Sequence, residues 1–271
     1  MEATDQSWPL RLFSRSALKQ RKFKEITGLL GKTEQLHCLD IGSDNGVISY
    51  LLRRRGGIWK SVDLDGEAVQ AICELVKDNV FQIDGRQTPF HDNEFDRVII
   101  IDFLEHIHTD RDFIHELYRI IKAGGELIIN VPNLKTTFLR KIRLMLGQTD
   151  EKHGHVRPGY TIDSLLELLT DQFTVLSYKT YSKFFSECID MLITWALDML
   201  KKGQTSSLKG RLVTEHDLCR YRKTFRLYSL IYPIVWLLAK LDILLFWSSG
   251  YMLIVKARIT KNPQASPICQ P

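Results

Sequence analysis

The sequence predicts an α/β fold: a doubly wound sheet of seven mostly parallel strands, with a helical insertion before the last strand. From residue 36 onward, short apolar runs alternate with stretches of helical periodicity, as in sheets whose parallel strands are joined by crossover helices. The run RVIIID at 97–102 is apolar on both faces, which is typical of a central parallel strand. A chain of 271 residues is long enough for one such core with a modest addition.

The strands and helices are predicted from these runs in chain order. The predicted strands cover residues 36–41, 58–62, 80–83, 97–102, 126–131, 173–178 and 250–257. Helices are predicted at 47–55, 67–77 and 161–169, and a fourth helix follows the central strand. That helix is expected to begin at a capping box of Thr109 and Asp112 and to end at Lys122 and the pair Gly124–Gly125.

Residues 184–248 separate the sixth and seventh strands by far more chain than a hairpin needs, so we interpret them as an insertion. Residues 184–200 have the broad apolar face of an amphipathic helix, and 227–247 are rich in Leu, Ile, Trp and Tyr but interrupted by Pro233, Lys240 and Asp242. A single membrane crossing is excluded because both flanking strands belong to one sheet, which leaves docking at a membrane interface or a lid over a binding site. The predicted segments are an N-terminal helical or irregular segment (1–34), the main domain (35–183), the apolar and basic insertion (184–248), the final strand of the same sheet (249–258) and a flexible tail (259–271).

The positive charge of the chain is concentrated in this insertion. Residues 201–226 hold eight basic and two acidic side chains, a net charge of +6, so the rest of the chain is near neutral at −1. Such a block fits an anionic surface, either phospholipid or nucleic acid, and its alternative is a solvated loop.

The turn after the first strand, DIGSDNG at 40–46, carries the sharpest binding signal. Gly42 allows the backbone to approach a ligand, and Gly46 allows the next helix to start in tight packing. Asp63 follows Gly42 by 21 residues, at the end of the second strand, where an acidic side chain binds ribose hydroxyls in Rossmann-like sheets. The pattern predicts an adenosine-containing cofactor at the point where the strand order reverses.

Charge distinguishes the candidate cofactors. A dinucleotide-binding fold requires G-x-G-x-x-G, so that the amides of the helix can bind a pyrophosphate. Here the glycines are Gly42 and Gly46, and the carboxylates of Asp40 and Asp44 flank the turn. Carboxylates repel a pyrophosphate but attract the ammonium and sulfonium groups of S-adenosylmethionine. The turn therefore favours S-adenosylmethionine.

Several motifs in order resemble the class I S-adenosylmethionine-dependent methyltransferases. DIGSDNG at 40–46 resembles their motif I, and SVDLD at 61–65 resembles their second motif. The segment 83–96 is similar to the region around strands three and four, and FLEHI at 103–107 and LYRIIKAGG at 117–125 resemble two later blocks of the ubiquinone-biosynthesis-like (type 11) subgroup. The resemblance covers roughly residues 36–178 and the last strand, and it implies methyl transfer.

The resemblance also implies residue roles. Asp40 would lie near the methionine ammonium, and Gly42 and Ser43 would give backbone contacts. Asp63 would hold the ribose, Leu64 would cover the adenine, and Asp84, next to Gly85, would accept from the adenine amino group. Asp102 and Phe103 would lie near the methionine end. Asp44 departs from the family, which usually has a glycine there, although Asp tolerates unusual backbone angles better than most residues. Structural alternatives exist, since Asp84 would serve equally well to cap a turn with Gly85, and Asp102 to cap a strand end.

Histidines supply the candidate catalytic groups. If the acceptor is a hydroxyl, a general base is needed, and His106, just after the fourth strand, is the first candidate, with His155 second. The alternative for His106 is a satisfied core histidine. His153 and His155 also resemble metal ligands, but no third ligand is evident nearby, so no metal site is predicted.

The five cysteines show no paired spacing, and the polar N-terminal stretch is not a signal peptide. We therefore expect a cytoplasmic protein, peripheral at the inner membrane face, without structural disulfides or a zinc cluster. The expected activity is S-adenosylmethionine-dependent methylation of a small, lipid-linked or envelope-glycan acceptor, with O-methylation favoured. The alternatives are an RNA or DNA methyltransferase, which the interleaved apolar helices disfavour, and a non-catalytic cofactor-binding scaffold. The sequence makes no prediction about oligomeric state.

Overall fold

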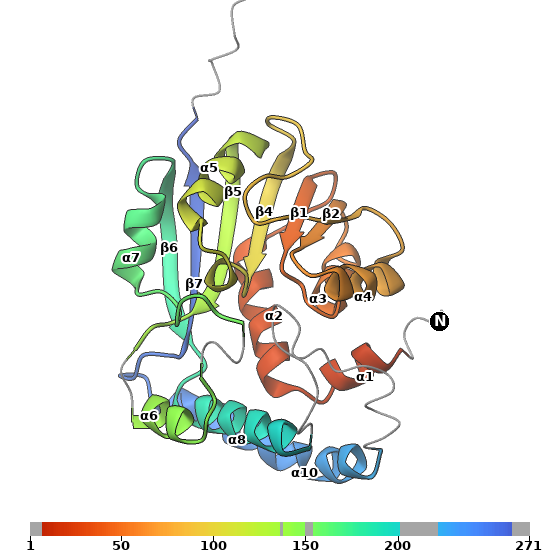
Figure 1. Cartoon of the computed structure of the whole chain (residues 1–271), viewed down its shortest axis with the longest axis vertical. Helices are drawn as coiled ribbons and strands as arrows, with labels where there is room; N and C mark the ends of the chain where they lie inside the picture. The colour runs from red at the N-terminus through yellow and green to blue at the C-terminus, as the bar shows by residue number, and fades with distance from the viewer. Residues whose placement is uncertain (1–6, 136–137, 150–153, 201–221, 262–271) are drawn as a thin grey trace, which may run out of the picture.

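Seven strands form one sheet in the order β3-β2-β1-β4-β5-β7-β6 (Figure 1). The computed structural model describes residues 7–135, 138–149, 154–200 and 222–261. The strands are β1 (His37–Ile41), β2 (Ile58–Asp63), β3 (Val80–Gln82), β4 (Phe95–Ile101), β5 (Ile121–Pro132), β6 (Phe173–Tyr181) and β7 (Met252–Ile259). All pairs from β3 to β5 are parallel, and β7 is antiparallel to both of its neighbours. The predicted seven-stranded, mostly parallel sheet is confirmed.

Helices lie on both faces of the sheet and at one end of it (Figure 1). They are α1 (Trp8–Phe13), α2 (Ala17–Leu30), α3 (Val47–Arg53), α4 (Gly66–Val76), α5 (Asp110–Ile120), α6 (Phe138–Met145), α7 (Ile162–Leu169), α8 (Phe184–Leu200) and α10 (Arg222–Lys240), with short 3-10 turns η2 (Leu104–His106) and η4 (Leu241–Leu244). The central strand shows why two faces are covered. Val98 and Ile100 of β4 belong to the core cluster that includes residues of α5 and α7, whereas Ile99 and Ile101 belong to the cluster that includes residues of α2 and α3. Alternate side chains of a strand point to opposite faces, so a strand apolar at every position needs helices on both.

The predictions for the start and the end of α5 were partly wrong. Thr109 is the N-cap residue of α5, but its side chain makes no capping hydrogen bond, so the predicted box with Asp112 does not form. The box appears instead at α7, between Thr161 and Ser164. The helix α5 ends at Ile120, and residues from Ile121 onward already belong to β5, so Lys122 and Gly124–Gly125 lie in the strand rather than at a helix end. Pairing with Phe95 of β4, followed by a register shift, extends the strand in this direction.

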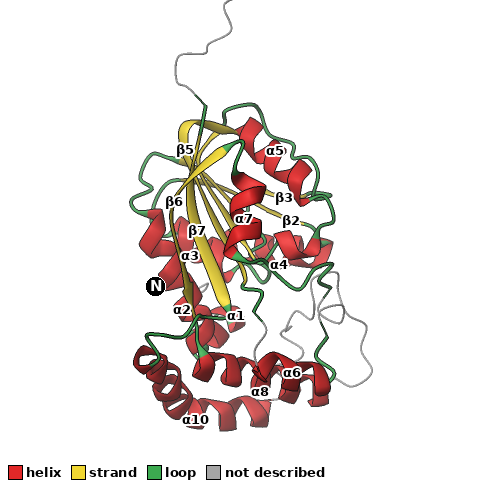
Figure 2. Ribbon diagram, turned by 90° about the vertical axis from the view of Figure 1, so that its left-hand side faces the viewer, coloured by secondary structure: helices red, strands yellow, loops and turns green. Residues whose placement is uncertain are grey.

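The helices α6, α8, α10 and η4, hereafter the helical layer, lie across one end of the sheet (Figures 1 and 2). Pro132 of β5 and Tyr181 of β6 both pair with Met252 of β7, so these two strands end side by side. The chain continues from β5 into α6 and from β6 into α8. The layer therefore covers the carboxyl edge of the sheet, where ligands bind in open α/β folds. The sequence analysis did not predict α6; it did predict a helix at 184–200, where α8 lies.

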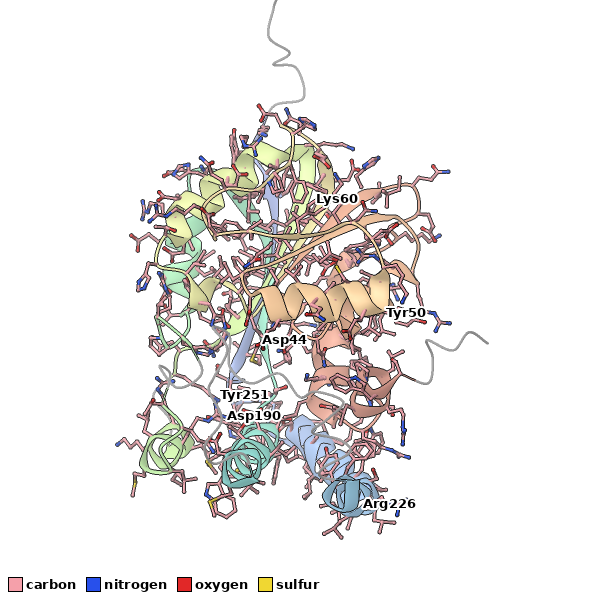
Figure 3. The ribbon with its side chains drawn as sticks, turned by 45° about the vertical axis from the view of Figure 1, so that its right-hand side comes forward. Asp44, Tyr50, Lys60, Asp190, Arg226 and Tyr251 are labelled. Carbon is pink, nitrogen blue, oxygen red and sulfur yellow. The ribbon has the colours of Figure 1, made fainter. Side chains whose placement is uncertain are left out.

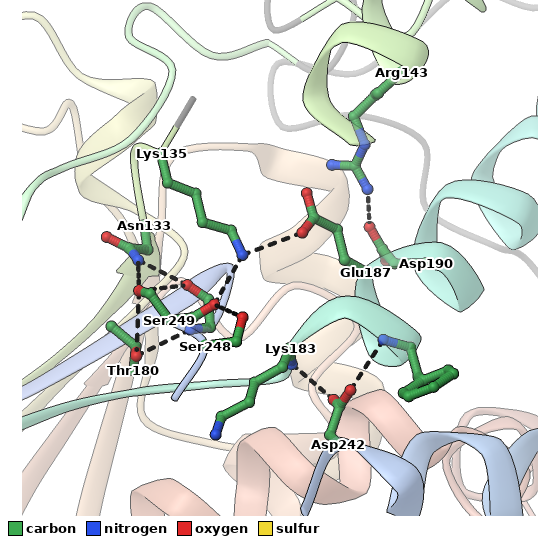
Figure 4. A network of polar contacts seen from close by, with 12 residues as sticks. Asn133, Lys135, Arg143, Thr180, Lys183, Glu187, Asp190, Asp242, Ser248 and Ser249 are labelled. Carbon is green, nitrogen blue, oxygen red and sulfur yellow. Dashed lines mark hydrogen bonds and ion pairs between the residues drawn. The ribbon is translucent and has the colours of Figure 1, made fainter. Parts of the chain in front are cut away.

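Polar contacts fix the helical layer to the sheet (Figure 4). Asp242 of η4 accepts hydrogen bonds from the backbone nitrogens of Lys183 (2.6 Å) and Phe185 (2.9 Å), which satisfies donors at the start of α8. Lys135, just beyond β5, pairs with Glu187 of α8 at 3.2 Å and donates to the carbonyl oxygen of Ser249 at 3.0 Å. The two ends of the insertion are thus held together at the carboxyl edge.

Candidate functional site

The turn after β1 has the backbone that the sequence requires. Gly42 (φ 87°), Asp44 (φ 59°) and Gly46 (φ 75°) all adopt the left-handed region. Asp44 therefore takes the conformation of the glycine that it replaces, as a short polar residue can. A Cβ on Gly46 would lie 2.7 Å from the Cα of Ile72 in α4, so only glycine allows α3 to start this close to α4.

Asp40 holds the turn together from inside. Its side chain is fully buried and accepts hydrogen bonds from the hydroxyl groups of Ser43 (2.5 Å), Ser49 (2.5 Å) and Ser61 (2.7 Å). Arg53 adds an ion pair at 3.5 Å. These contacts join β1, β2 and α3. The predicted contact of Asp40 with a methionine ammonium stays a prediction, and it competes with these internal donors. Ser43 likewise uses its hydroxyl group inside the turn, and its carbonyl oxygen accepts from the backbone nitrogen of Gly46 at 3.1 Å, so its predicted backbone contact with the cofactor also stays a prediction.

Asp63 ends β2 beside the same turn. One carboxylate oxygen accepts from the backbone nitrogens of Leu64 (2.7 Å) and Asp65 (3.5 Å), and the other accepts from the backbone nitrogen of Asp44 (3.4 Å). The carboxylate is therefore oriented by backbone donors and lies next to the glycine turn. This is the place from which it would accept the hydroxyl groups of a ribose.

Leu64, Gly85 and Ile107 come together from three loops. A Cβ on Gly85 (φ 78°) would lie 2.6 Å from Cγ2 of Ile107 and 3.1 Å from Cδ2 of Leu64, so these residues are in contact range. Asp84 beside them is exposed, and one of its oxygens accepts from the backbone nitrogens of Arg86 (2.8 Å) and Gln87 (3.1 Å), which lowers the pKa of its carboxyl group. Asp84 thus caps a turn, and its predicted contact with adenine remains a prediction.

Asp102, directly after β4, anchors a polar group that the sequence did not predict. It has φ 45°, forms an ion pair with Lys22 of α2, and accepts from the side-chain amide of Asn130 at 2.9 Å. The hydroxyl group of Tyr181 donates to the oxygen of the same amide. Burial opposes the charge of Lys22, but Asp102 outweighs it and raises the lysine pKa. No local pattern could have found Lys22, because α2 is 80 residues away in the chain.

Phe103 and His106 follow Asp102 with different environments. Phe103 is fully buried, with its ring 5.0 Å from that of Phe113 in α5, so its side chain belongs to the core and only its backbone remains for a cofactor contact. His106 is half-buried; its Nδ1 lies 3.0 Å from the carbonyl oxygen of Gly154, and its ring meets that of His155 edge to face at 4.8 Å.

The sequence shows no third metal ligand near His153 and His155, and the tertiary structure supplies candidates for one. The fold brings Glu105 and His106 beside His155, and the ligating atoms of these three residues all lie within 4.8 Å of one another. Glu105 is fully buried. His153 lies outside the described residues. Glu105 was missed because its partner His155 is 50 positions away, beyond the reach of any spacing rule.

Comparisons with known proteins identify similar methyltransferases. Residues 39–129 match the family model described as a methyltransferase domain. The chain is 29% identical over 116 residues to the ubiquinone biosynthesis O-methyltransferase of Pseudomonas paraeruginosa, covering 40% of this chain and 48% of that protein. It is 23% identical over 104 residues to the demethylmenaquinone methyltransferase of Tropheryma whipplei, covering 37% and 44%. The chain thus spans about half the length of the curated relatives it matches.

Solved structures share the fold. A SAM-dependent methyltransferase from Archaeoglobus fulgidus superposes with a TM-score of 0.55 at 16% identity, covering 93% of this chain and all of that one (100%). The cyclase SpnF superposes with a TM-score of 0.56 at 17% identity, covering 90% and 83%. One of these proteins is described as a methyltransferase and the other as a cyclase. The likenesses therefore show the fold, and the reaction has to be inferred from the residues of the site.

Proposed function

We propose that this chain, whose residues 39–129 match a methyltransferase-domain family model, is a class I S-adenosylmethionine-dependent methyltransferase that transfers a methyl group to a small, lipid-like acceptor at a membrane surface. The observation that carries the proposal is the turn at Gly42–Gly46 with Asp63 oriented beside it. Three left-handed residues in this turn and a carboxylate held by backbone donors fit an adenosine cofactor that carries positive charge. Gly85 also suits a close-packed binding site, because a Cβ at this position would lie 2.6 Å from Cγ2 of Ile107 and 3.1 Å from Cδ2 of Leu64.

Each part of the site has a separate task. Asp63 would accept the ribose hydroxyl groups, while Leu64 and Ile107 would pack against the base. Asp102 would lie at the methionine end, where its pairing with Lys22 and Asn130 fixes its orientation. When bound, S-adenosylmethionine supplies a methyl group already activated on sulfonium. The chain's own work is therefore mainly to position an acceptor, which contributes about 7–11 kcal/mol in well-oriented reactions.

The acceptor class is supported by the relatives. Two of them are named for ubiquinone biosynthesis and for demethylmenaquinone, so their names refer to quinones. A small lipid-like acceptor is the corresponding proposal for this chain, with an oxygen as the favoured methylated atom. Transfer to a hydroxyl oxygen needs the proton to be removed, and His106, with His155 second, is the predicted base.

The helical layer supports action at a membrane surface. Many of its large apolar side chains are exposed, and they continue to the end of the insertion: Leu144, Met145, Leu146, Leu192, Trp195, Met199, Leu227, Leu230, Ile231, Ile234, Trp236, Leu237, Leu238, Ile243, Leu244, Phe246 and Trp247. Many exposed large apolar side chains on one layer are typical of an interaction site rather than of ordinary protein surface. Because the layer covers the carboxyl edge, an acceptor that left a bilayer there would reach the site directly.

The long helix α10 lies flat in this arrangement. Residues 225–244 are long and apolar enough to cross a membrane, by length and composition, and Tyr232 is the one buried residue among them. However, Tyr232 in its middle hydrogen-bonds Gln20 of α2 at 3.2 Å, and Tyr228 donates to the carbonyl oxygen of Arg15 at 2.8 Å. These contacts hold one side of α10 on the N-terminal helices and leave another side for an interface. In Figure 3, Arg226 projects from α10 at the far end of the molecule from the sheet.

Calorimetry and methyl transfer test the proposal together. Purified protein should bind S-adenosylhomocysteine, and with tritiated S-adenosylmethionine and a cell extract it should label the lipid fraction. Label in RNA or DNA alone would replace the lipid acceptor with a nucleic acid. Cofactor binding without label in any fraction would favour a scaffold, and absence of cofactor binding would refute the whole assignment.

A further inference from the structure

We propose that Glu105, His106 and His155 bind a divalent transition-metal ion next to the methyl-transfer site. Ion binding stands on these residues alone, whereas the role given to the ion below rests on the proposed methyl transfer. The cluster consists of two imidazole rings and one carboxylate, from η2 and from the loop after α6.

The donor set fits a catalytic rather than a structural ion. Two histidine nitrogens and one glutamate oxygen make three protein ligands, which leaves positions for water or a substrate oxygen. At metal–ligand distances of about 2.0–2.2 Å, two ligands of a tetrahedral ion lie roughly 3.4 Å apart. The ligating atoms here lie within 4.8 Å of one another, so small side-chain rotations would close the site.

The hydrogen bond of His106 prepares its ring to be a ligand. The carbonyl oxygen of Gly154 can only accept, so Nδ1 of His106, 3.0 Å away, carries the proton. In the neutral ring this leaves Nε2 unprotonated, which is the form that binds a metal. Metal-bound histidines in proteins are usually oriented by such a hydrogen bond from the other nitrogen to a carbonyl or carboxylate.

The loop that carries His155 is fixed against η2. The backbone nitrogen of Val156 donates to the carbonyl oxygen of Glu105 at 2.8 Å, so the two ligand-bearing segments are joined directly. Arg157 pairs with Asp110 and donates to the carbonyl oxygen of Ile107 at 3.0 Å. Tyr160 adds a hydrogen bond to Asp110 at 2.9 Å. A segment held at this many points can present His155 in one position, as a metal site requires.

The location gives the ion a function. Glu105 lies in η2, three residues after Asp102, which directly follows the carboxyl end of β4. The cluster therefore adjoins the methionine end of the proposed cofactor site. A cation there would bind the acceptor hydroxyl and stabilise its deprotonated form, with the proton released to water. The oxygen lone pair then forms the O–CH₃ bond as the S–CH₃ bond breaks, and the electron pair of that bond stays on sulfur. In this scheme His106 and His155 are ligands rather than bases.

Metal titration of the full chain, without a histidine tag and after treatment with a chelator, tests the site. We expect one Zn²⁺ per chain by calorimetry, and Co²⁺ should give visible absorption bands of a low-coordinate site with nitrogen ligands. Glu105→Gln and His155→Ala should each weaken Zn²⁺ binding by at least about 100-fold, more than is typical for a residue that only supports a ligand. His91→Ala, which removes an exposed histidine from another loop, should leave binding unchanged.

Cofactor binding separates this proposal from the preceding one. Both cluster variants should still bind S-adenosylhomocysteine and keep the far-ultraviolet spectrum of the parent chain. If the parent chain binds S-adenosylhomocysteine but neither Zn²⁺ nor Co²⁺, or if the two variants bind Zn²⁺ as tightly as the parent, the metal site is refuted and the methyltransferase proposal stands. If the parent chain binds metal but not S-adenosylhomocysteine, the metal site stands and the methyltransferase proposal is refuted.

Discussion

Asp40 and Asp63 are both predicted from the sequence to bind the cofactor, but their surroundings in the structure differ. Asp40, one residue before the end of β1, and Asp63, at the end of β2, both lie beside the glycine turn, and both are fully buried. The carboxylate of Asp40 accepts hydrogen bonds from three hydroxyl groups and pairs with an arginine, so removal of this carboxylate would leave buried donors without an acceptor. Asp63 is held by backbone nitrogens of the turn itself, which aims it at whatever the turn binds. The first residue is expected to contribute mainly to stability, and the second to binding.

Asp63→Asn should therefore weaken binding of S-adenosylhomocysteine by about 10- to 100-fold. The physical reason is the loss of hydrogen bonds to a charged acceptor, worth about 1.5–3 kcal/mol, with tenfold in affinity for each 1.4 kcal/mol. Calorimetry would measure the affinity, and thermal unfolding would show that the fold is kept. Asp78→Asn, at an exposed position before β3, is the matched control. Equal affinities for the parent chain and the Asp63 variant would remove Asp63 from the site.

At the scale of elements, α5 is tied to the preceding loop through one buried carboxylate. Glu116 accepts from the backbone nitrogen (2.8 Å) and hydroxyl group (2.5 Å) of Thr88, and Arg119 donates to it from Nε at 2.8 Å. Burial alone raises the pKa of Glu116, but the hydrogen bonds from Arg119 and Thr88 outweigh it and hold the pKa below 4.5. The ionised form is thus the one that stabilises the packing of α5 against the loop between β3 and β4.

Glu116→Gln should lower the free energy of unfolding at pH 7 by about 1–3 kcal/mol, because a buried charged acceptor is lost. A carboxyl group whose pKa is lowered on folding contributes stability above its unfolded pKa and loses it as the pH falls through the folded pKa. The difference between variant and parent should accordingly shrink below about pH 4.5. Urea unfolding at several pH values measures it, with exposed Glu74→Gln as control. A pH-independent difference would contradict the assigned role.

At the scale of the whole molecule, one end of the protein is apolar and the site lies beneath it. The helical layer is anchored to the end of the sheet through Lys135, which pairs with Glu187 of α8. Contacts of Asp242 with the start of α8, and the ion pair of Arg143 with Asp190, hold the layer itself together. Its apolar side chains point elsewhere, since many are more than half exposed, as in Ile243 (81%) and Trp247 (72%). Anionic lipid is the partner that also fits the basic block at 201–226, most of which lies outside the described residues.

The protein should therefore co-sediment with vesicles containing anionic lipid, and high salt should remove much of this binding. A basic residue near such a surface contributes about 1 kcal/mol and an inserted large apolar side chain about 1.5–3 kcal/mol. Ile243→Ser and Trp247→Ser should each weaken binding about tenfold or more. Ile58→Ser removes an equally typical exposed isoleucine at the amino end of β2, on the opposite edge of the sheet, and should change nothing. Binding to RNA in place of vesicles would point to a nucleic-acid partner, and no binding to either would leave the layer as a lid.

The sequence by itself determined the sheet, the glycine turn and the acidic residue after β2. These depend on short-range properties: apolar runs choose strands, glycine and aspartate permit left-handed backbone, and Asp63 lies at a fixed distance from Gly42. Element ends near α5 were predicted less well, because strand pairing of Ile121 with Phe95 overrode the helix-stop signal of Gly124–Gly125.

Only the tertiary structure decided which polar groups meet. Lys22 reaches Asp102 from a helix far away in the chain, and Glu105 and His106 meet His155 because a loop after α6 is pinned to η2. Such contacts join residues 49 to 80 positions apart, and no periodicity or spacing encodes them. They follow from the packing of whole elements against a shared sheet, whose burial of apolar surface fixes the position of every loop that the strands carry.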